Sequence, residues 1–210
     1  MKKEIKLYES WKDITLGQMQ DLEKISKDNP DASEFELSCL YISYLYSVDA
    51  KTIPFQEFQA YAKSLLFLGE PIPETKLQLD YNVNGINYKL DINPSAFTAG
   101  QFQDWSSYNL GEDKNLKNFL SVVMIPEGHK YCENYDIEKT KEDMLSLPMT
   151  TVNSIVSFFS ALSLKYVDLL RFFLRRLLKK SKKKMDKNQY EDLEKQIETL
   201  FNNLESYPIS

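Results

Sequence analysis

The sequence predicts a mainly helical α+β fold built from two related halves, completed by a long helix and a C-terminal helix. Three observations support this prediction. Residues 6–21 and 89–104 are identical at seven of sixteen positions, at a constant offset of 83 residues. Apolar and polar residues alternate through 77–92 around Asn84-Gly85, which is typical of a β-hairpin. Elsewhere, apolar residues recur at the three- and four-residue spacing of amphipathic helices.

The repeated segment encodes the same helix start twice. Thr15 and Thr98 fall at the N-cap position, where a hydroxyl accepts a hydrogen bond from a free backbone N–H. Gln18 and Gln101 fall three positions later, which completes a capping box in each copy. We therefore expect each half to open with a short β element that turns into a capped helix. A duplicated unit of this kind builds scaffolds or interfaces and does not by itself supply catalytic groups.

A glycine lies two positions after each cap. Gly17 and Gly100 fall in the first helical turn, where capping does not require glycine. Glycine costs up to about 1 kcal/mol relative to alanine inside a helix, and less near its end. We expect another backbone segment to pass close to these glycines, because a residue without Cβ permits that approach.

The first half, residues 1–70, is expected to contain a short strand and three helices. Alternating apolar residues indicate the strand at 3–9. Ser33 and Glu36 form a further capping box, and Pro54 suits the start of a helix. The expected helices span residues 16–28, 34–47 and 54–68. The predicted apolar stripes are Leu37, Tyr41, Tyr44 and Leu45 in the second helix and Phe58, Tyr61, Ala62 and Leu65 in the third.

The second half, residues 71–180, is expected to open with the hairpin and to continue as helices. A proline-rich linker at 69–73 separates it from the first half. Pro126 and Gly128 end the helix that precedes them. The expected helices span residues 98–111, 113–124, 136–147 and 150–180.

The helix at 150–180 is apolar over a wide arc. Such a helix is either central to a core or covered by a partner. We expect its first half in the core and leave its second half open between core and oligomer contact. The last unit, residues 181–210, is expected to be a basic linker and a C-terminal helix. Its heptad-like seam is a candidate subunit contact and consists of Tyr190, Leu193, Ile197, Leu200 and Leu204.

A strongly basic stretch spans residues 171–187. It contains nine cations and one anion, Asp186, so its net charge is +8, whereas the whole chain carries −5. One interpretation is that these cations complement the dipole at the end of a helix. The other is that they contact nucleic-acid backbone or an acidic partner. The candidate contact residues are Arg171, Arg175, Arg176, Lys179, Lys180, Lys182, Lys183 and Lys184.

No motif in the sequence points to catalysis, a cofactor or a metal. His129 is the single histidine, and the two cysteines, Cys39 and Cys132, supply neither a disulfide framework nor paired zinc ligands. The six glycines are scattered and form no phosphate-binding loop. We therefore expect a protein that is not an enzyme, carries no cofactor and resides in a reducing environment.

The sequence also predicts no membrane segment. Residues 144–164 carry no charge, but they include Pro148, Asn153 and several hydroxyl side chains, so we expect no spanning helix there. The charged first six residues lack the apolar region of a secretory signal peptide.

Four segments carry a resemblance to known proteins. They are W-K-D-I-T-L-G-Q at 11–18, F-T-A-G-Q-F-Q-D at 97–104, V-V-M-I-P-E-G at 122–128 and E-D-M-L-S-L-P-M at 142–149. Over residues 5–175 the chain resembles small morphogenesis proteins of tailed bacteriophages, especially crAss-like phages of Bacteroidetes. It is also similar to phage tail assembly chaperones, in which a short β element precedes a helical bundle. The resemblance identifies no functional residue.

The resemblance implies a non-enzymatic protein of phage assembly. The first expectation is a virion component, namely a ring, adaptor or internal cargo protein near portal and tail, present in host cytoplasm during assembly. Its partners would be portal, ring or tail proteins, further copies of itself and packaged DNA, without membrane contact. The first alternative is a tail assembly chaperone that is absent from the mature virion. The second is a nucleic-acid-binding regulator that uses the Lys-rich segment.

Overall fold

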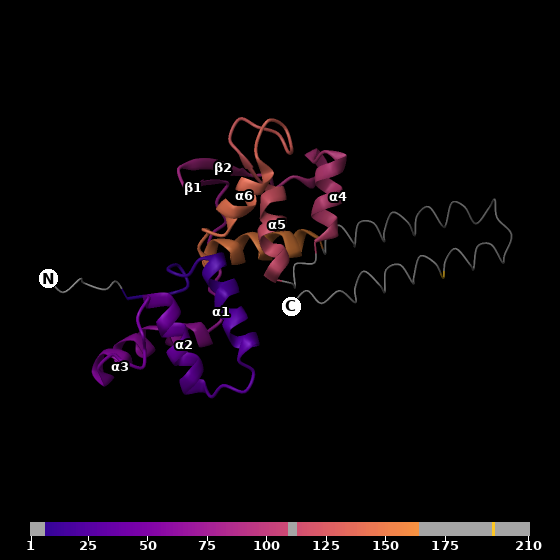
Figure 1. The fold of residues 1–210 in the computed structure, drawn as a ribbon. Helices are drawn as coiled ribbons and strands as arrows, with labels where there is room; N and C mark the ends of the chain where they lie inside the picture. Colours follow the sequence, from indigo (N-terminus) through magenta and orange to yellow (C-terminus); the bar gives the residue numbers. More distant parts are fainter. Residues whose placement is uncertain (1–6, 109–112, 164–194, 196–210) are drawn as a thin grey trace, which may run out of the picture. The chain divides into compact units, whose positions relative to one another are not determined.

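The computed structural model describes residues 7–108 and 113–163, together with residue 195 (Figure 1). The chain divides into two compact units, one of residues 1–108 and 113–155 and the other of residues 109–112 and 156–210. The described residues combine helices with a three-stranded antiparallel sheet. The predicted α+β class is therefore confirmed, while the duplication of a structural unit stays a prediction.

Three helices form the first part of the chain. Helix α1 spans Leu16–Asp28, α2 spans Glu34–Tyr46, α3 spans Phe55–Ser64, and the 3₁₀ turn η1 spans Leu66–Gly69. The three α-helices begin where the sequence predicts, because their start signals are local. Thr15 and Ser33 each form a capping box, and Pro54 directly precedes α3. The third helix is shorter than expected, since its last turn is η1.

The buried side of α2 differs from the predicted stripe. Cys39, Ile42 and Leu45 are buried, whereas Tyr44 is exposed. Apolar residues occur on nearly every side of α2, so spacing alone does not show which side packs inward. The predicted stripe of α3, in contrast, is buried apart from the half-buried Ala62.

Aromatic contacts fasten the residues before α1 to the other helices. The Tyr8 ring meets Tyr46 edge-on with centroids 5.2 Å apart, and Tyr46 stacks on Tyr61 at 4.3 Å. Trp11 is buried, and its Nε1–H donates to the carbonyl of Glu70 at 3.1 Å. The chain of rings from Tyr8 through Tyr46 to Tyr61 thus connects the segment before α1 with α2 and α3.

The sheet consists of β1 (Asp80–Val83), β2 (Ile86–Leu90) and β3 (Met124–Pro126), in the order β1-β2-β3. Asn84 and Gly85 have φ values of 51° and 82°, as the tight turn of the predicted hairpin requires. Leu90 pairs with Met124 across β2 and β3. The helix predicted at 113–124 includes residue 124, and that part of the prediction is wrong, because Met124 begins β3. A short apolar run fits a helix end and a buried strand equally well.

The strand predicted at 3–9 is not seen in its described part. Residues 7–9 take part in no strand, and residues 3–6 lie outside the described residues. Thr15 instead makes an isolated antiparallel bridge with Pro148. The β element next to the first capped helix is therefore supplied by a segment far away in the sequence.

Helices follow the hairpin, and one strand separates them. The elements are the 3₁₀ turn η2 (Pro94–Ala96), α4 (Ala99–Ser107), α5 (Asp113–Val123), α6 (Ile137–Met144) and a helix at 149–163. All four predicted helices of the second half are present. The predicted continuation of the last helix to residue 180 lies outside the described residues.

The centre of the first unit is built from α5, β2, β3, the end of α6 and the start of the helix at 149–163. Val152 and Ile155 are fully buried there, which confirms the expected core position of this helix for its first two turns. The least exposed large side chains of the first unit include Tyr88, Phe119, Leu120, Val122, Met124, Met144 and Ile155.

The helix at 149–163 is anchored at its start. Met149 N–H donates to the carbonyl of Ile14 at 2.8 Å. Thr75 N–H donates to Ser154 Oγ at 3.2 Å, and Ser154 Oγ lies 3.0 Å from the carbonyl of Thr75. The extended linker before β1 is thus fixed along this helix by side-chain to backbone hydrogen bonds.

The N-terminus of α1 receives its hydrogen-bond acceptors from the turn after α6. Leu16 N–H donates to the carbonyl of Leu147, and Gly17 N–H donates to that of Leu145, both at 2.9 Å. These two N–H groups have no acceptor within their own helix. Main-chain oxygens from a segment about 130 residues away therefore complete the end of α1.

The two copies of the repeat are not alike in detail. Thr15 Oγ1 accepts from Gln18 N–H at 3.2 Å and Gln18 Oε1 accepts from Thr15 N–H at 3.0 Å, so the first predicted capping box is confirmed. Thr98 Oγ1 accepts from Gln101 N–H at 3.1 Å. The buried Gln101 side chain instead donates from Nε2 to the carbonyl of Val122 at 3.0 Å. The second copy is capped by its threonine only, because α5 engages the glutamine.

The two glycines also differ. A Cβ on Gly17 would lie 3.3 Å from the carbonyl oxygen of Leu145, so the predicted close approach of another backbone is confirmed there. Around Gly100 no described heavy atom lies within 4 Å of a Cβ, so the same prediction is wrong for the second copy.

Substituting alanine at Gly17 should destabilise the protein. The Leu145 carbonyl oxygen cannot move away from the new Cβ without losing its hydrogen bond from Gly17 N–H. Strain of about 1–3 kcal/mol should outweigh a gain in helix propensity of up to about 1 kcal/mol. Gly100→Ala is the matched control and should be neutral or slightly stabilising. Chemical denaturation of both variants measures the difference, and a Gly17→Ala protein as stable as the parent would contradict the close-packing argument.

Candidate functional site

An exposed apolar surface lies on α2, α3 and η1. Phe35, Phe55 and Leu66 are 63%, 69% and 70% exposed. The Phe35 ring packs against Phe58 with centroids 5.3 Å apart, and Phe55 precedes Phe58 by three positions on α3, so the two lie on one side of that helix. We call Phe35, Phe55 and Leu66 the apolar surface. Leu66 lies on the 3₁₀ turn that follows α3. Single exposed apolar residues are ordinary, but two exposed aromatic residues next to Phe58, on the adjoining helices α2 and α3, are typical of a contact surface.

The spacing of apolar residues in the sequence does not predict the apolar surface. Phe35 is the second residue of α2 and Phe55 the first of α3. Each therefore falls at the edge of its predicted stripe, where spacing does not distinguish a buried from an exposed residue. One sequence signal for the exposure of Phe55 is that this residue does not belong to the apolar stripe predicted for α3.

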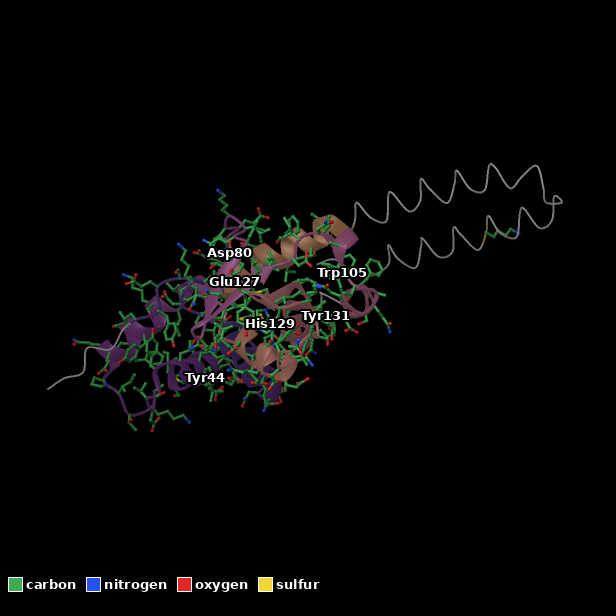
Figure 2. All side chains as sticks on the ribbon, turned by 90° about the horizontal axis from the view of Figure 1, so that it is seen from above. Tyr44, Asp80, Trp105, Glu127, His129 and Tyr131 are labelled. Carbon is green, nitrogen blue, oxygen red and sulfur yellow. The ribbon has the colours of Figure 1, made fainter. Side chains whose placement is uncertain are left out.

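The loop between β3 and α6 holds several residues that could carry chemistry. His129 and Tyr131 come from this loop, whereas Trp105 comes from α4 (Figure 2). Cys132 lies in the same loop. His129 Nδ1 lies 3.3 Å from the carbonyl of Glu133, a contact within the same tight loop. His129 is exposed, in keeping with the loop position that the sequence predicts.

Tyr131 joins the same loop to α4. Its hydroxyl donates to Asp104 Oδ2 at 2.6 Å. Burial raises the pKa of Tyr131, and the hydrogen bond to the Asp104 carboxylate raises it further, so the phenol stays neutral at physiological pH. The contact fixes the loop against α4. Among the residues that the structure describes, no group of three or more His, Cys, Asp or Glu side chains is arranged to hold a metal ion.

A buried carboxylate joins the hairpin to α6. Asp143 is 6% exposed, and it accepts from the hydroxyl of Tyr88 and from Nδ2 of Asn84, both at 2.7 Å. Asn84 Nδ2 also lies 3.2 Å from Ser146 Oγ. The backbone of Asn84 thus forms part of the hairpin turn, and its side chain donates to the Asp143 carboxylate. A buried charge needs such partners, and here they come from the turn and from β2.

The pKa of Tyr88 is raised above its usual value. Burial is the largest cause, and the hydrogen bond to Asp143 adds to it, because both favour the neutral phenol. The geometry of the polar cluster of Tyr88, Asp143 and Asn84 indicates a role in holding the fold together. Tyr88 and Asn84 both donate to Asp143, and the Tyr88 side chain is 1% exposed.

The predicted site residues divide into two sets. The repeat caps lie at the starts of α1 and α4, as described above. The basic residues from Arg171 to Lys184 and the heptad seam from Tyr190 to Leu204 lie outside the described residues. Their predicted contacts with nucleic acid, acidic partners or other subunits stay predictions.

Comparison with protein-family models, with curated proteins and with solved structures finds no match for this chain. Among the helices of residues 7–108 and 113–163, none has both the length and the apolar character needed to cross a membrane.

Replacing Tyr88 by Phe should lower the free energy of unfolding by about 1.5–3 kcal/mol at neutral pH, the range for a hydrogen bond to a charged group. Tyr81→Phe is the matched control, because Tyr81 pairs with Tyr88 in the sheet but its hydroxyl only accepts from Gln78 N–H at the surface. Urea denaturation measures both variants. Equal losses in the two would show that the Asp143 carboxylate does not depend on Tyr88.

Alkaline pH should weaken the fold partly through Tyr88. Its pKa is higher in the folded than in the unfolded chain, where it is about 10. The resulting stability is fully present below pH of about 10 and is lost as the pH rises towards the folded pKa. Denaturation at several pH values should therefore show a shallower alkaline loss for Tyr88→Phe than for the parent. Parallel pH profiles would contradict this assignment.

Proposed function

We propose that this chain is a non-enzymatic structural or morphogenesis protein of a tailed bacteriophage. In this proposal it is a virion-associated ring, adaptor or internal cargo protein near the portal and tail, and it acts by protein–protein packing. The sequence resemblance over residues 5–175 supports the phage context. The apolar surface supports the mode of action.

The exposure of the apolar surface is the observation that carries the proposal. Phe55 and Leu66 each leave about two-thirds of their area open to water, on helices fixed by the buried contacts of Phe58 and Tyr61. Aromatic side chains are enriched at the centre of protein interfaces, where their burial supplies much of the binding energy. A preformed helical face also loses little conformational freedom when a partner binds.

Mass spectrometry of density-purified virions, compared with the infected-cell lysate, tests the proposal. Presence in particles at a copy number near that of the portal protein would support a ring, adaptor or cargo protein. Abundance in lysate with absence from particles would replace the proposal by a tail assembly chaperone. Recovery with nucleic acid in a salt-dependent manner, and not with phage proteins, would favour a regulator that uses the Lys-rich segment.

Phe55→Ser should leave stability within about 0.5 kcal/mol of the parent, because the ring is mostly in water. The same change should lower incorporation into particles, since it removes an aromatic side chain from the apolar surface. Phe58→Ser is the matched control. That residue is buried and three positions away on the same helix, and its truncation should cost about 3–5 kcal/mol.

Denaturation curves and quantitative mass spectrometry of virions separate the two effects. A Phe55→Ser protein that is incorporated at parental copy number would show that the apolar surface makes no contact in the particle.

A further inference from the structure

The hairpin turn carries the only Asn-Gly pair in the sequence, Asn84-Gly85. Asparagine followed by glycine is the pair most susceptible to deamidation, because glycine has no side chain that hinders access to its backbone nitrogen. Both residues are exposed, and beyond its chain neighbours no described heavy atom lies within 4 Å of a Cβ at Gly85. The turn is therefore open to water, which the reaction consumes.

Deamidation of this pair would replace a neutral amide by a carboxylate. The backbone nitrogen of Gly85 attacks Cγ of Asn84, a bond forms between these two atoms, and the Cγ–Nδ2 bond breaks. Nδ2 leaves as ammonia with the proton of the Gly85 N–H. Water then opens the cyclic imide and leaves either an aspartate or an isoaspartate, in which the main chain runs through the side-chain carbons. Water is the only co-reactant that these steps need.

The folded hairpin holds Asn84 away from the geometry that ring closure needs. Asn84 and Gly85 have φ values of 51° and 82°, as in a type I′ turn, and ψ is also positive in the left-handed region. The Gly85 nitrogen reaches Cγ only after the Cα–C bond of Asn84 rotates out of that region. The amide itself is also held, because Nδ2 lies 2.7 Å from Asp143 Oδ1 and 3.2 Å from Ser146 Oγ.

The product would not fit beside Asp143. A carboxylate only accepts hydrogen bonds, so the group that faces Asp143 has to be a donor, and Nδ2 of Asn84 is one. Deamidation puts a second carboxylate in its place. Asp143 is 6% exposed, so water screens the repulsion less than it would at the surface. Two carboxylates this close are not both ionised without a large cost in free energy.

We propose that Asn84 is a site of spontaneous deamidation that the fold suppresses, and that its conversion disconnects the hairpin turn from α6. Conversion proceeds from a locally opened turn, in which the Asn84 backbone is free to rotate. The opened turn cannot return to its original contacts afterwards, because the product carboxylate is repelled by Asp143. Each conversion is thus an irreversible record of one opening. The inference goes beyond the proposed function and does not rest on it.

Incubation of the full chain at neutral pH, once folded and once unfolded in urea, tests the suppression. Peptide mapping by mass spectrometry measures the converted fraction of Asn84, with aspartate and isoaspartate separated by chromatography. Conversion should be at least about tenfold slower in the folded chain, because it requires opening of the turn. Asn82 is the internal control. It lies exposed on β1 before Val83 and should convert far more slowly than Asn84 in urea.

Three variants test the consequence for the fold by urea denaturation. Asn84→Asp places the product carboxylate against Asp143 and should lower the folding equilibrium constant at least about tenfold. Asn82→Asp is the matched control and should change it little, because Asn82 donates to Asn87 at the surface. Asn84→Asp combined with Asp143→Asn exchanges the amide and the carboxylate, and should recover most of the lost stability.

Several results would overturn the proposal. These are equal conversion rates of Asn84 in the folded and unfolded chains, no more conversion of Asn84 than of Asn82 in urea, or an Asn84→Asp protein as stable as the parent. If Asn84→Asp does not fold, the double variant decides, since its folding supports the repulsion and its failure contradicts it. None of these outcomes bears on whether the protein is packaged in virions, so the two proposals fail separately.

Discussion

The hydrogen-bonded junction between the start of α1 and the turn after α6 is the constraint on which much of the first unit depends. Gly17 and Leu16 donate to two carbonyls of residues 145–147, and Met149 donates back to Ile14. Each bond satisfies a main-chain group that has no partner within its own element. Because the bonds run both ways, the junction fixes α1 and the start of the helix at 149–163 at once. The glycine permits this approach, which explains a residue that local helix propensity disfavours.

The Asp143 cluster performs a related task with side chains. It ties the hairpin turn, through Asn84, and the central strand, through Tyr88, to the end of α6. That helix end leads directly into the turn that caps α1. A buried charge is therefore placed where two parts of the fold meet, and its stability depends on both being formed. The apolar surface lies on α2, α3 and η1, apart from these bonded elements, and its side chains are mostly exposed.

The repeat shows how one local sequence takes two roles. Both threonines cap their helices, because the hydroxyl and the N–H that it binds are three residues apart. The two glutamines have different partners. Gln18 completes its capping box, whereas Gln101 is drawn to the end of α5. The same local signal thus fixes a helix start, while the neighbours of that start decide which other groups it can bind.

The sequence by itself determined the features that depend on residues a few positions apart. These include the helix starts after Thr15, Ser33 and Thr98, the hairpin turn at Asn84-Gly85, and the inward stripe of α3 between polar residues. Only the tertiary structure decided the third strand and the inward side of α2, whose apolar residues fit more than one arrangement. It also decided that Gly17 is packed and Gly100 is open. These features depend on contacts between segments far apart in the chain, which neither spacing nor propensity encodes.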